Sequence, residues 1–121
     1  TIGDAGAEDA KIVFDGNAQD YHIGLDDSAD TLVIGKGSAL GTTTAMSFDA
    51  NGIITKPLQP AFSAYLSANQ DNFALNSTVT VVFDREYYDV NADFNTSNYT
   101  FTAPVTGKYQ INITLRFNNV D

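Results

Sequence analysis

Short runs of alternating apolar and polar residues follow one another through the first half of the chain. They are Ile12-Val13-Phe14-Asp15-Gly16, Tyr21-His22-Ile23-Gly24-Leu25-Asp26, Leu32-Val33-Ile34-Gly35 and Met46-Ser47-Phe48-Asp49, with Ile53-Ile54 after the last. A period of two, with turn residues about every ten positions, predicts short β-strands. Each strand then has an apolar face, and His22 lies on the face opposite Ile23. Asp49-Ala50-Asn51-Gly52 predicts a hairpin turn, because Asn and Gly adopt positive φ at low cost.

The second half of the chain shows longer runs with the same period, at residues 78–83, 99–103 and 109–117. The clearest is residues 109–117, where every second side chain is apolar and the others are Gln110, Asn112, Thr114 and Arg116. Residues 62–66 fit either a strand or a helical face after Pro60, and residues 69–76 read as a loop. The pattern predicts antiparallel strands. The side chains expected in the core or at a trimer axis are Phe62, Val81, Phe83, Tyr99, Phe101, Tyr109, Ile111, Ile113, Leu115 and Phe117.

The composition changes near residue 57. Eight of the nine glycines precede residue 53, whereas eleven of the fourteen Phe and Tyr residues follow residue 60. Pro57 and Pro60 bracket the change, and proline pairs stiffen a short connector. We therefore predict a β-rich, shaft-like module over residues 1–56, a proline connector over 57–60 and a second β module over 61–121.

The first predicted module has too little apolar material for a core of its own. About fifty residues of short, glycine-rich strands cannot cover both faces of a sheet, and their unpaired edges favour association. The module must therefore pack on the second module or on further copies of the chain. We favour oligomerisation, because repeated short strands with polar turns suit stacking along a long axis.

From residue 60 onward the sequence resembles the jelly-roll family of tumour necrosis factor and the globular heads of complement subcomponent q. The resemblance lies in Ala61-Phe62-Ser63-Ala64, Val82-Phe83-Asp84, Tyr88-Asp89-Val90-Asn91 and a Phe-x-Ala-Pro-x-x-Gly-x-Tyr stretch from Phe101 to Tyr109. Ser97-Asn98 departs from the Thr-Gly that is common in the family. The match covers about half of such a domain, which implies a partial jelly roll completed by further chain or by neighbouring subunits.

The first module resembles the repeats that precede the tips of bacteriophage tail fibres, particularly those of marine phages. The matching residues are Ile23-Gly24-Leu25-Asp26-Asp27, Leu32-Val33-Ile34-Gly35, Gly41-Thr42-Thr43 and Phe48-Asp49-Ala50-Asn51-Gly52. Both resemblances imply homotrimers. Together they imply an all-β fibre, collar or capsid-decorating protein on the virion surface, which contacts other virion proteins and displays a β head to a host glycan or protein.

Composition removes several other classes of function. The formal net charge is −9 and the isoelectric point is near 4.1, which argues against nucleic acid because phosphate binding requires Lys and Arg. The sequence contains no apolar run of the ~18 residues needed to cross a bilayer, so we expect no membrane insertion. The absence of Cys excludes disulfides, thiol nucleophiles and thiolate metal sites. We expect no cofactor.

Two clusters of acidic residues are candidates for a metal site or a catalytic site. Asp26, Asp27 and Asp30 could bind calcium through carboxylate oxygens, although a solvated turn capped by Asp is the more common use of such a cluster. Asp84 and Glu86 share one face of an extended strand, whereas glycoside hydrolysis needs carboxylates on either side of a bond.

The remaining candidates also argue against an enzyme. His22 is the one imidazole of the chain, and the sequence has no Gly-x-Ser-x-Gly elbow to accompany it. Tyr87, Tyr88, Phe94 and Tyr99 fit sugar stacking as well as packing. We favour packing for Phe94 and Tyr99 and leave both interpretations open for Tyr87 and Tyr88. The sequence identifies no receptor-binding residue. A secreted bacterial adhesion or glycan-binding module is the alternative function, and a polysaccharide-degrading enzyme is a third.

Overall fold

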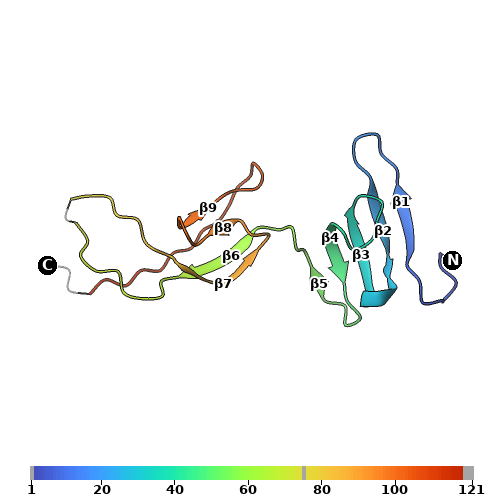
Figure 1. Cartoon of the computed structure of the whole chain (residues 1–121), viewed down its shortest axis with the longest axis horizontal. Helices are drawn as coiled ribbons and strands as arrows, with labels where there is room; N and C mark the ends of the chain where they lie inside the picture. Colours follow the sequence, from blue (N-terminus) through green and yellow to red (C-terminus); the bar gives the residue numbers. More distant parts are fainter. Residues whose placement is uncertain (1, 75, 119–121) are drawn as a thin grey trace.

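The computed structural model describes residues 2–74 and 76–118, and within them the fold is all-β with antiparallel pairing (Figure 1). This confirms the predicted fold class. The strands lie at β1 (Ala10–Phe14), β2 (Tyr21–Asp26), β3 (Thr31–Lys36), β4 (Thr44–Phe48), β5 (Ile54–Thr55), β6 (Ala61–Tyr65), β7 (Arg85–Val90), β8 (Phe94–Asn95) and β9 (Thr100–Phe101). A short 3-10 helix, η1 (Asp27–Ala29), joins β2 to β3.

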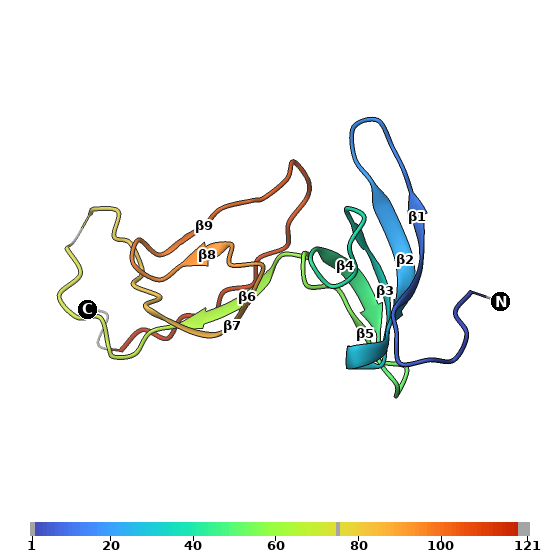
Figure 2. The same cartoon turned by 45° about the vertical axis from the view of Figure 1, so that its right-hand side comes forward.

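Strands β1 to β5 form one sheet in which each strand pairs with the next along the chain, as Figure 2 shows. The predicted turn at residues 49–52 connects β4 to β5. Gly52 has φ of 79°, and its N–H donates to the carbonyl oxygen of Asp49 over 2.9 Å. The carboxylate of Asp49 accepts the N–H groups of Asn51 and Ile53 at 2.9 and 2.8 Å. Local side-chain chemistry therefore closes this hairpin.

The other strands form two small ribbons. β6 pairs with β7 and β8 pairs with β9, both antiparallel. Residues 62–66, which fitted strand or helix, lie largely in β6, because Ala61 to Tyr65 pair with Val90 to Arg85. Residues 69–74 and 76 are outside any strand, as expected of a loop.

Two predicted strands are not strands in the structure. Residues 78–83 and 109–117 have no assigned strand. Among the described residues, the backbone–backbone hydrogen bonds outside the strands include Phe83 N–H to Val81 carbonyl but none from residues 109–117. Alternation shows that a segment suits a sheet, but a ladder also requires a neighbouring strand. These two segments therefore have the sequence of strands without the pairing.

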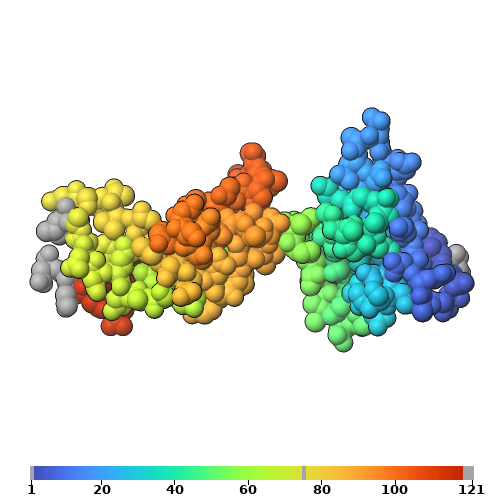
Figure 3. Space-filling view, in the orientation of Figure 1, coloured from blue at the N-terminus to red at the C-terminus, as the bar shows by residue number. Residues whose placement is uncertain are grey.

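The described residues bury few large apolar side chains. Val33 in the five-stranded sheet is 2% exposed and Phe94 in β8 is 9% exposed, and the remaining large apolar residues are at least partly open to solvent. Figure 3 shows a narrow waist between the group formed by β1 to β5 and the group formed by β6 to β9. In the described part of the chain, no helix has the length and apolar character needed to cross a membrane.

Candidate association surface and aromatic groove

One face of the five-stranded sheet is apolar from edge to edge. Its central row runs across four strands as Ile12, Ile23, Ile34 and Met46, each the direct partner of the next. The paired positions on this face, which we call the apolar face, are Ala10, Ile12, Phe14, Tyr21, Ile23, Leu25, Leu32, Ile34, Lys36, Met46, Phe48 and Ile54. Lys36, at one end of β3, is the charged member of this set.

The apolar face is open to solvent. Phe14 is 59% exposed, and Ile12, Tyr21, Leu25, Leu32 and Ile54 are each at least 40% exposed. Four strands of five or six residues, about 4.8 Å apart and about 17–20 Å long, cover roughly 400 Å² in projection together with the two-residue β5. An apolar patch of this size equals the largest patch on a typical monomer, and such patches commonly mark interaction sites.

The opposite face of the same sheet is the buried one. Ile23, on the apolar face, is only half-buried, whereas its neighbour His22, on the opposite face, is 1% exposed. The segment after β3 folds against the face of His22. The ring Nδ1 lies 2.8 Å from the carbonyl oxygen of Gly37, and Lys11 Nζ donates to the carbonyl oxygen of Ser38 over 2.7 Å. Polar loop contacts thus cover this face while the apolar face stays open.

The environment of His22 fixes one ring nitrogen and isolates the other. Because a carbonyl oxygen only accepts hydrogen bonds, Nδ1 carries the proton that it donates to Gly37. Nε2 is buried without a hydrogen-bond partner among the described residues. A metal site needs several converging ligands. No group of three His, Asp or Glu side chains within residues 2–74 and 76–118 could hold a metal ion.

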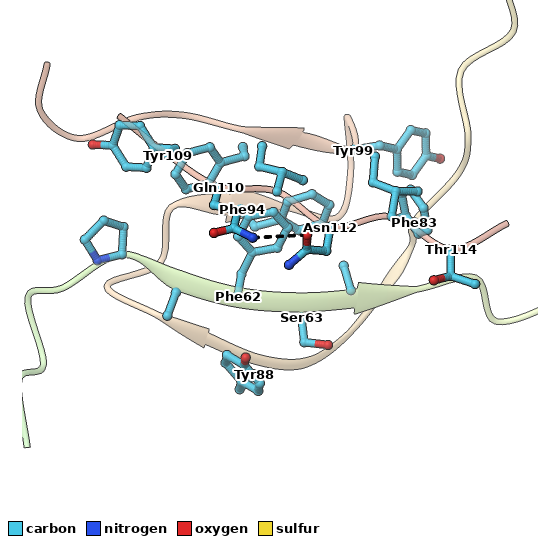
Figure 4. Close-up of a pocket in the computed structure, with 16 residues that line it drawn as sticks. Phe62, Ser63, Phe83, Tyr88, Phe94, Tyr99, Tyr109, Gln110, Asn112 and Thr114 are labelled. Carbon is cyan, nitrogen blue, oxygen red and sulfur yellow. Dashed lines mark hydrogen bonds between the residues drawn. The ribbon is translucent and has the colours of Figure 1, made fainter. Parts of the chain in front are cut away.

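The second half of the chain contains a groove lined by aromatic rings. Phe62 stacks on Phe94 with ring centroids 4.8 Å apart and on Phe101 at 5.1 Å, and Tyr109 meets the edge of Phe101 at 5.4 Å. The groove has a volume of about 730 Å³ and is open. Figure 4 shows Phe62 rising from β6 toward Phe94, with the hydrogen-bonded side chains of Gln110 and Asn112 beside these rings.

A carboxylate holds Phe94 in place. Asp89, at the end of β7, accepts the N–H groups of Asp93 and Phe94 at 3.2 and 3.0 Å. The intervening residues Asn91 and Ala92 have φ of 76° and 55°, so the chain reverses sharply between them. The two hydrogen bonds compensate for this uncommon backbone conformation. They place the Phe94 ring against Phe62.

The side chains predicted to pack fall into two groups. Those that line the groove are Phe62, Phe83, Tyr99, Phe101, Tyr109, Ile111 and Ile113. Ile111 and Ile113 are exposed all the same, as are Leu115 and Phe117, while Val81 is half-buried. Phe117 meets the edge of Phe73 at a centroid distance of 6.5 Å. Phe94, for which the sequence favours packing over sugar stacking, is buried at 9% exposed.

The acidic cluster after β2 caps local backbone. The carboxylate of Asp26 accepts the hydroxyl of Ser28 at 2.8 Å and the N–H of Ala29 at 3.2 Å, and so forms the N-cap of η1. Asp30 ends this helix in the left-handed region, with φ of 50°. The N–H of Asp27 donates to Asp9 over 3.1 Å. Asp26 therefore uses its carboxylate in the turn, which agrees with the capping interpretation of the cluster.

Asp84 is likewise engaged by its neighbours. Its two carboxylate oxygens accept the N–H and the hydroxyl of Ser67 at 2.8 and 2.6 Å. The hydroxyl of Ser67, followed by its N–H, holds the pKa of Asp84 below the ordinary value of 3.8. Glu86, the second residue of β7, pairs with Ala64 of β6. Asp84 thus lies just before β7 and Glu86 lies within it, and Asp84 anchors the loop after β6.

Comparisons with known proteins give no further guide to this chain. No family model, no curated protein and no solved structure matches it.

Proposed function

We propose that this chain is a structural and adhesive component of a phage virion, such as a tail fibre, a collar or a capsid-decorating fibre. In this proposal it acts as a homotrimer on the virion surface, where it contacts other virion proteins and presents its second half to a host glycan or protein. It has no catalytic role. The resemblance of residues 61–109 to trimeric jelly-roll heads supports the proposal, as does that of the first module to fibre repeats.

The open apolar face of β1 to β5 is the observation that carries self-association. The only charged residue among the paired positions of this face is Lys36, at its end, so leaving the face in water costs free energy. The same face on another copy can cover it, as in symmetric oligomers. Three sheets about 20 Å wide, arranged as a triangular prism, would each lie roughly 6 Å from the common axis. Half the usual spacing between packed sheets is about 5 Å, so side chains can fill such a prism.

Two neighbouring residues of β1 provide a matched test. Ile12 is 43% exposed on the apolar face, and Val13 is 37% exposed on the opposite face. We expect the wild-type chain to be trimeric by sedimentation equilibrium, Ile12→Asp to be monomeric, and Val13→Asp to remain trimeric. A monomeric wild-type chain, or equal effects of the two substitutions, would contradict self-association through this face.

The virion location needs a separate experiment. We expect an antibody raised against the chain to label purified phage particles at an external appendage in electron micrographs. Labelling of a bacterial surface in cultures that carry no phage would instead favour the secreted adhesion module.

A further inference from the structure

Among the described residues, Tyr87 has the most exposed of the large apolar and aromatic side chains. It is 75% open to solvent, in the middle of β7. Ser63 pairs with Tyr88 and Ala64 pairs with Glu86, which leaves Tyr87 as the extra residue of a β-bulge. Bulges re-aim side chains, and this one presents an aromatic ring to solvent.

One face of the Tyr87 ring packs against a second tyrosine. It stacks on Tyr65 of β6 with ring centroids 4.4 Å apart and an interplanar angle of 23°. Stacking already restricts both rings. Tyr87 would therefore lose less side-chain entropy on binding a ligand than an isolated tyrosine would. We call Tyr65 and Tyr87 the tyrosine platform.

The platform lies on the side of β6 away from the aromatic groove. Figure 4 shows Phe62 pointing into the groove, whereas Ser63 and Tyr88 point to the other side of the ribbon. Because side chains alternate along a strand, Tyr65 shares the side of Ser63. The platform is therefore separate from the surface that would accept further strands over Phe62.

Polar groups border the platform. Arg85 is the direct partner of Tyr65 and so shares its side of the ribbon, whereas Glu86 pairs with Ala64 on the side of Phe62. The Ser67 hydrogen bonds hold the Asp84 carboxylate at the start of β7. An aromatic face with a guanidinium at its edge offers stacking together with hydrogen-bond donors.

We propose that the tyrosine platform binds a pyranose ring of a neutral glycan. The C–H face of a sugar ring packs on an aromatic face, and its hydroxyls hydrogen-bond to the bordering polar groups. Acidic sugars are disfavoured, because the chain carries a net charge of −9. The inference deepens the adhesive part of the proposed function and rests on it.

Binding is tested with the assembled wild-type chain on a panel of neutral hexose oligosaccharides, with sulfated and sialylated oligosaccharides beside them. We expect calorimetry to detect binding to at least one neutral oligosaccharide and to no acidic one. Tyr87→Ala should weaken this binding at least tenfold, which corresponds to about 1.4 kcal/mol. Tyr87→Trp should retain it. Ile53→Ala removes a comparably exposed side chain from the turn between β4 and β5 and should change nothing.

The outcomes separate this inference from self-association. Absence of binding to every neutral oligosaccharide, or unchanged affinity in Tyr87→Ala, would overturn the glycan site and leave the trimer intact. If Tyr87→Ala lowers the number of subunits in the same samples, the platform is a contact between copies and the glycan assignment is wrong. Glycan binding by a wild-type chain that proves monomeric would support the platform although self-association through the apolar face had failed.

Discussion

The imidazole of His22 occupies the space in which a Cβ atom on Gly35 would stand. The two residues are direct partners across β2 and β3, and a Cβ at Gly35 would lie 2.6 Å from both Cε1 and Nε2 of the ring. The absence of a side chain at Gly35 thus allows His22 to lie flat against the next strand. The ring then reaches the carbonyl oxygen of Gly37 and holds the segment after β3 on this face.

Gly35→Ala should therefore destabilise the first half of the chain. The new methyl would meet the carbonyl oxygen of Thr43 at 2.6 Å as well as the ring of His22, and neither is a flexible chain end. Overpacking of this kind costs about 1–3 kcal/mol, measurable by urea denaturation. Gly107→Ala is the control, since its Cβ would find only Tyr109 Cε2, at an ordinary 3.7 Å. Equal stability of the two variants would show that His22 can move away freely.

The carboxylate of Asp89 should matter for the aromatic groove. Asp89→Ala removes two hydrogen bonds to the N–H groups of Asp93 and Phe94. We expect a loss of about 1–3 kcal/mol of stability, because hydrogen bonds to charged groups exceed neutral ones. Asp89→Asn keeps one acceptor oxygen and should lose less. Near-ultraviolet circular dichroism should also weaken in Asp89→Ala as Phe94 leaves Phe62, and an unchanged spectrum would contradict this role.

The sequence predicted those elements whose formation is governed by nearby residues. Alternation located the strands around Ile23 and Ile34, and Asp49 with Gly52 located the hairpin turn, since these side chains act within a few positions of the structure they specify. Strand β7 was harder to recognise, because the bulge at Tyr87 breaks its alternation.

The other features of the fold and of the candidate sites depend on contacts between residues that are distant in the sequence. The burial of His22 rests on the carbonyl oxygen of Gly37 and on the space above Gly35, neither of which alternation can reveal. Residues 109–117 have the clearest alternation of the chain but no ladder, because pairing depends on a second strand elsewhere. The tyrosine platform also required the structure, which alone shows Tyr87 stacked on Tyr65.

The turn at Asp49 should weaken in acid. The N–H of Ile53, together with that of Asn51, holds the pKa of Asp49 below its ordinary value of 3.8. A carboxyl group with a lowered pKa in the folded state contributes stability above its unfolded pKa, and the contribution is lost as pH falls through the folded value. Asn at this position can accept the same hydrogen bonds but does not titrate.

The difference in Tm between wild type and Asp49→Asn should therefore stay constant from about pH 7 to pH 5 and shrink below about pH 4. Thermal melts followed by far-ultraviolet circular dichroism provide the measurement. A difference that persists or grows at about pH 2 would show that the ionised carboxylate adds nothing to this turn.

Salt should strengthen the proposed trimer. Each copy carries −9, so three copies carry −27 (3 × −9), and the apolar face must hold them together against this repulsion. Salt at about 0.1 M reduces the Debye length to ~10 Å, and higher concentrations shorten it further. We expect Tm of the trimer to rise with NaCl up to about 0.5 M, and KCl at the same ionic strength to act equally. The monomeric Ile12→Asp variant should respond less, since it carries the repulsion of one chain only. A trimer whose Tm is flat or falls with NaCl would contradict this balance of forces.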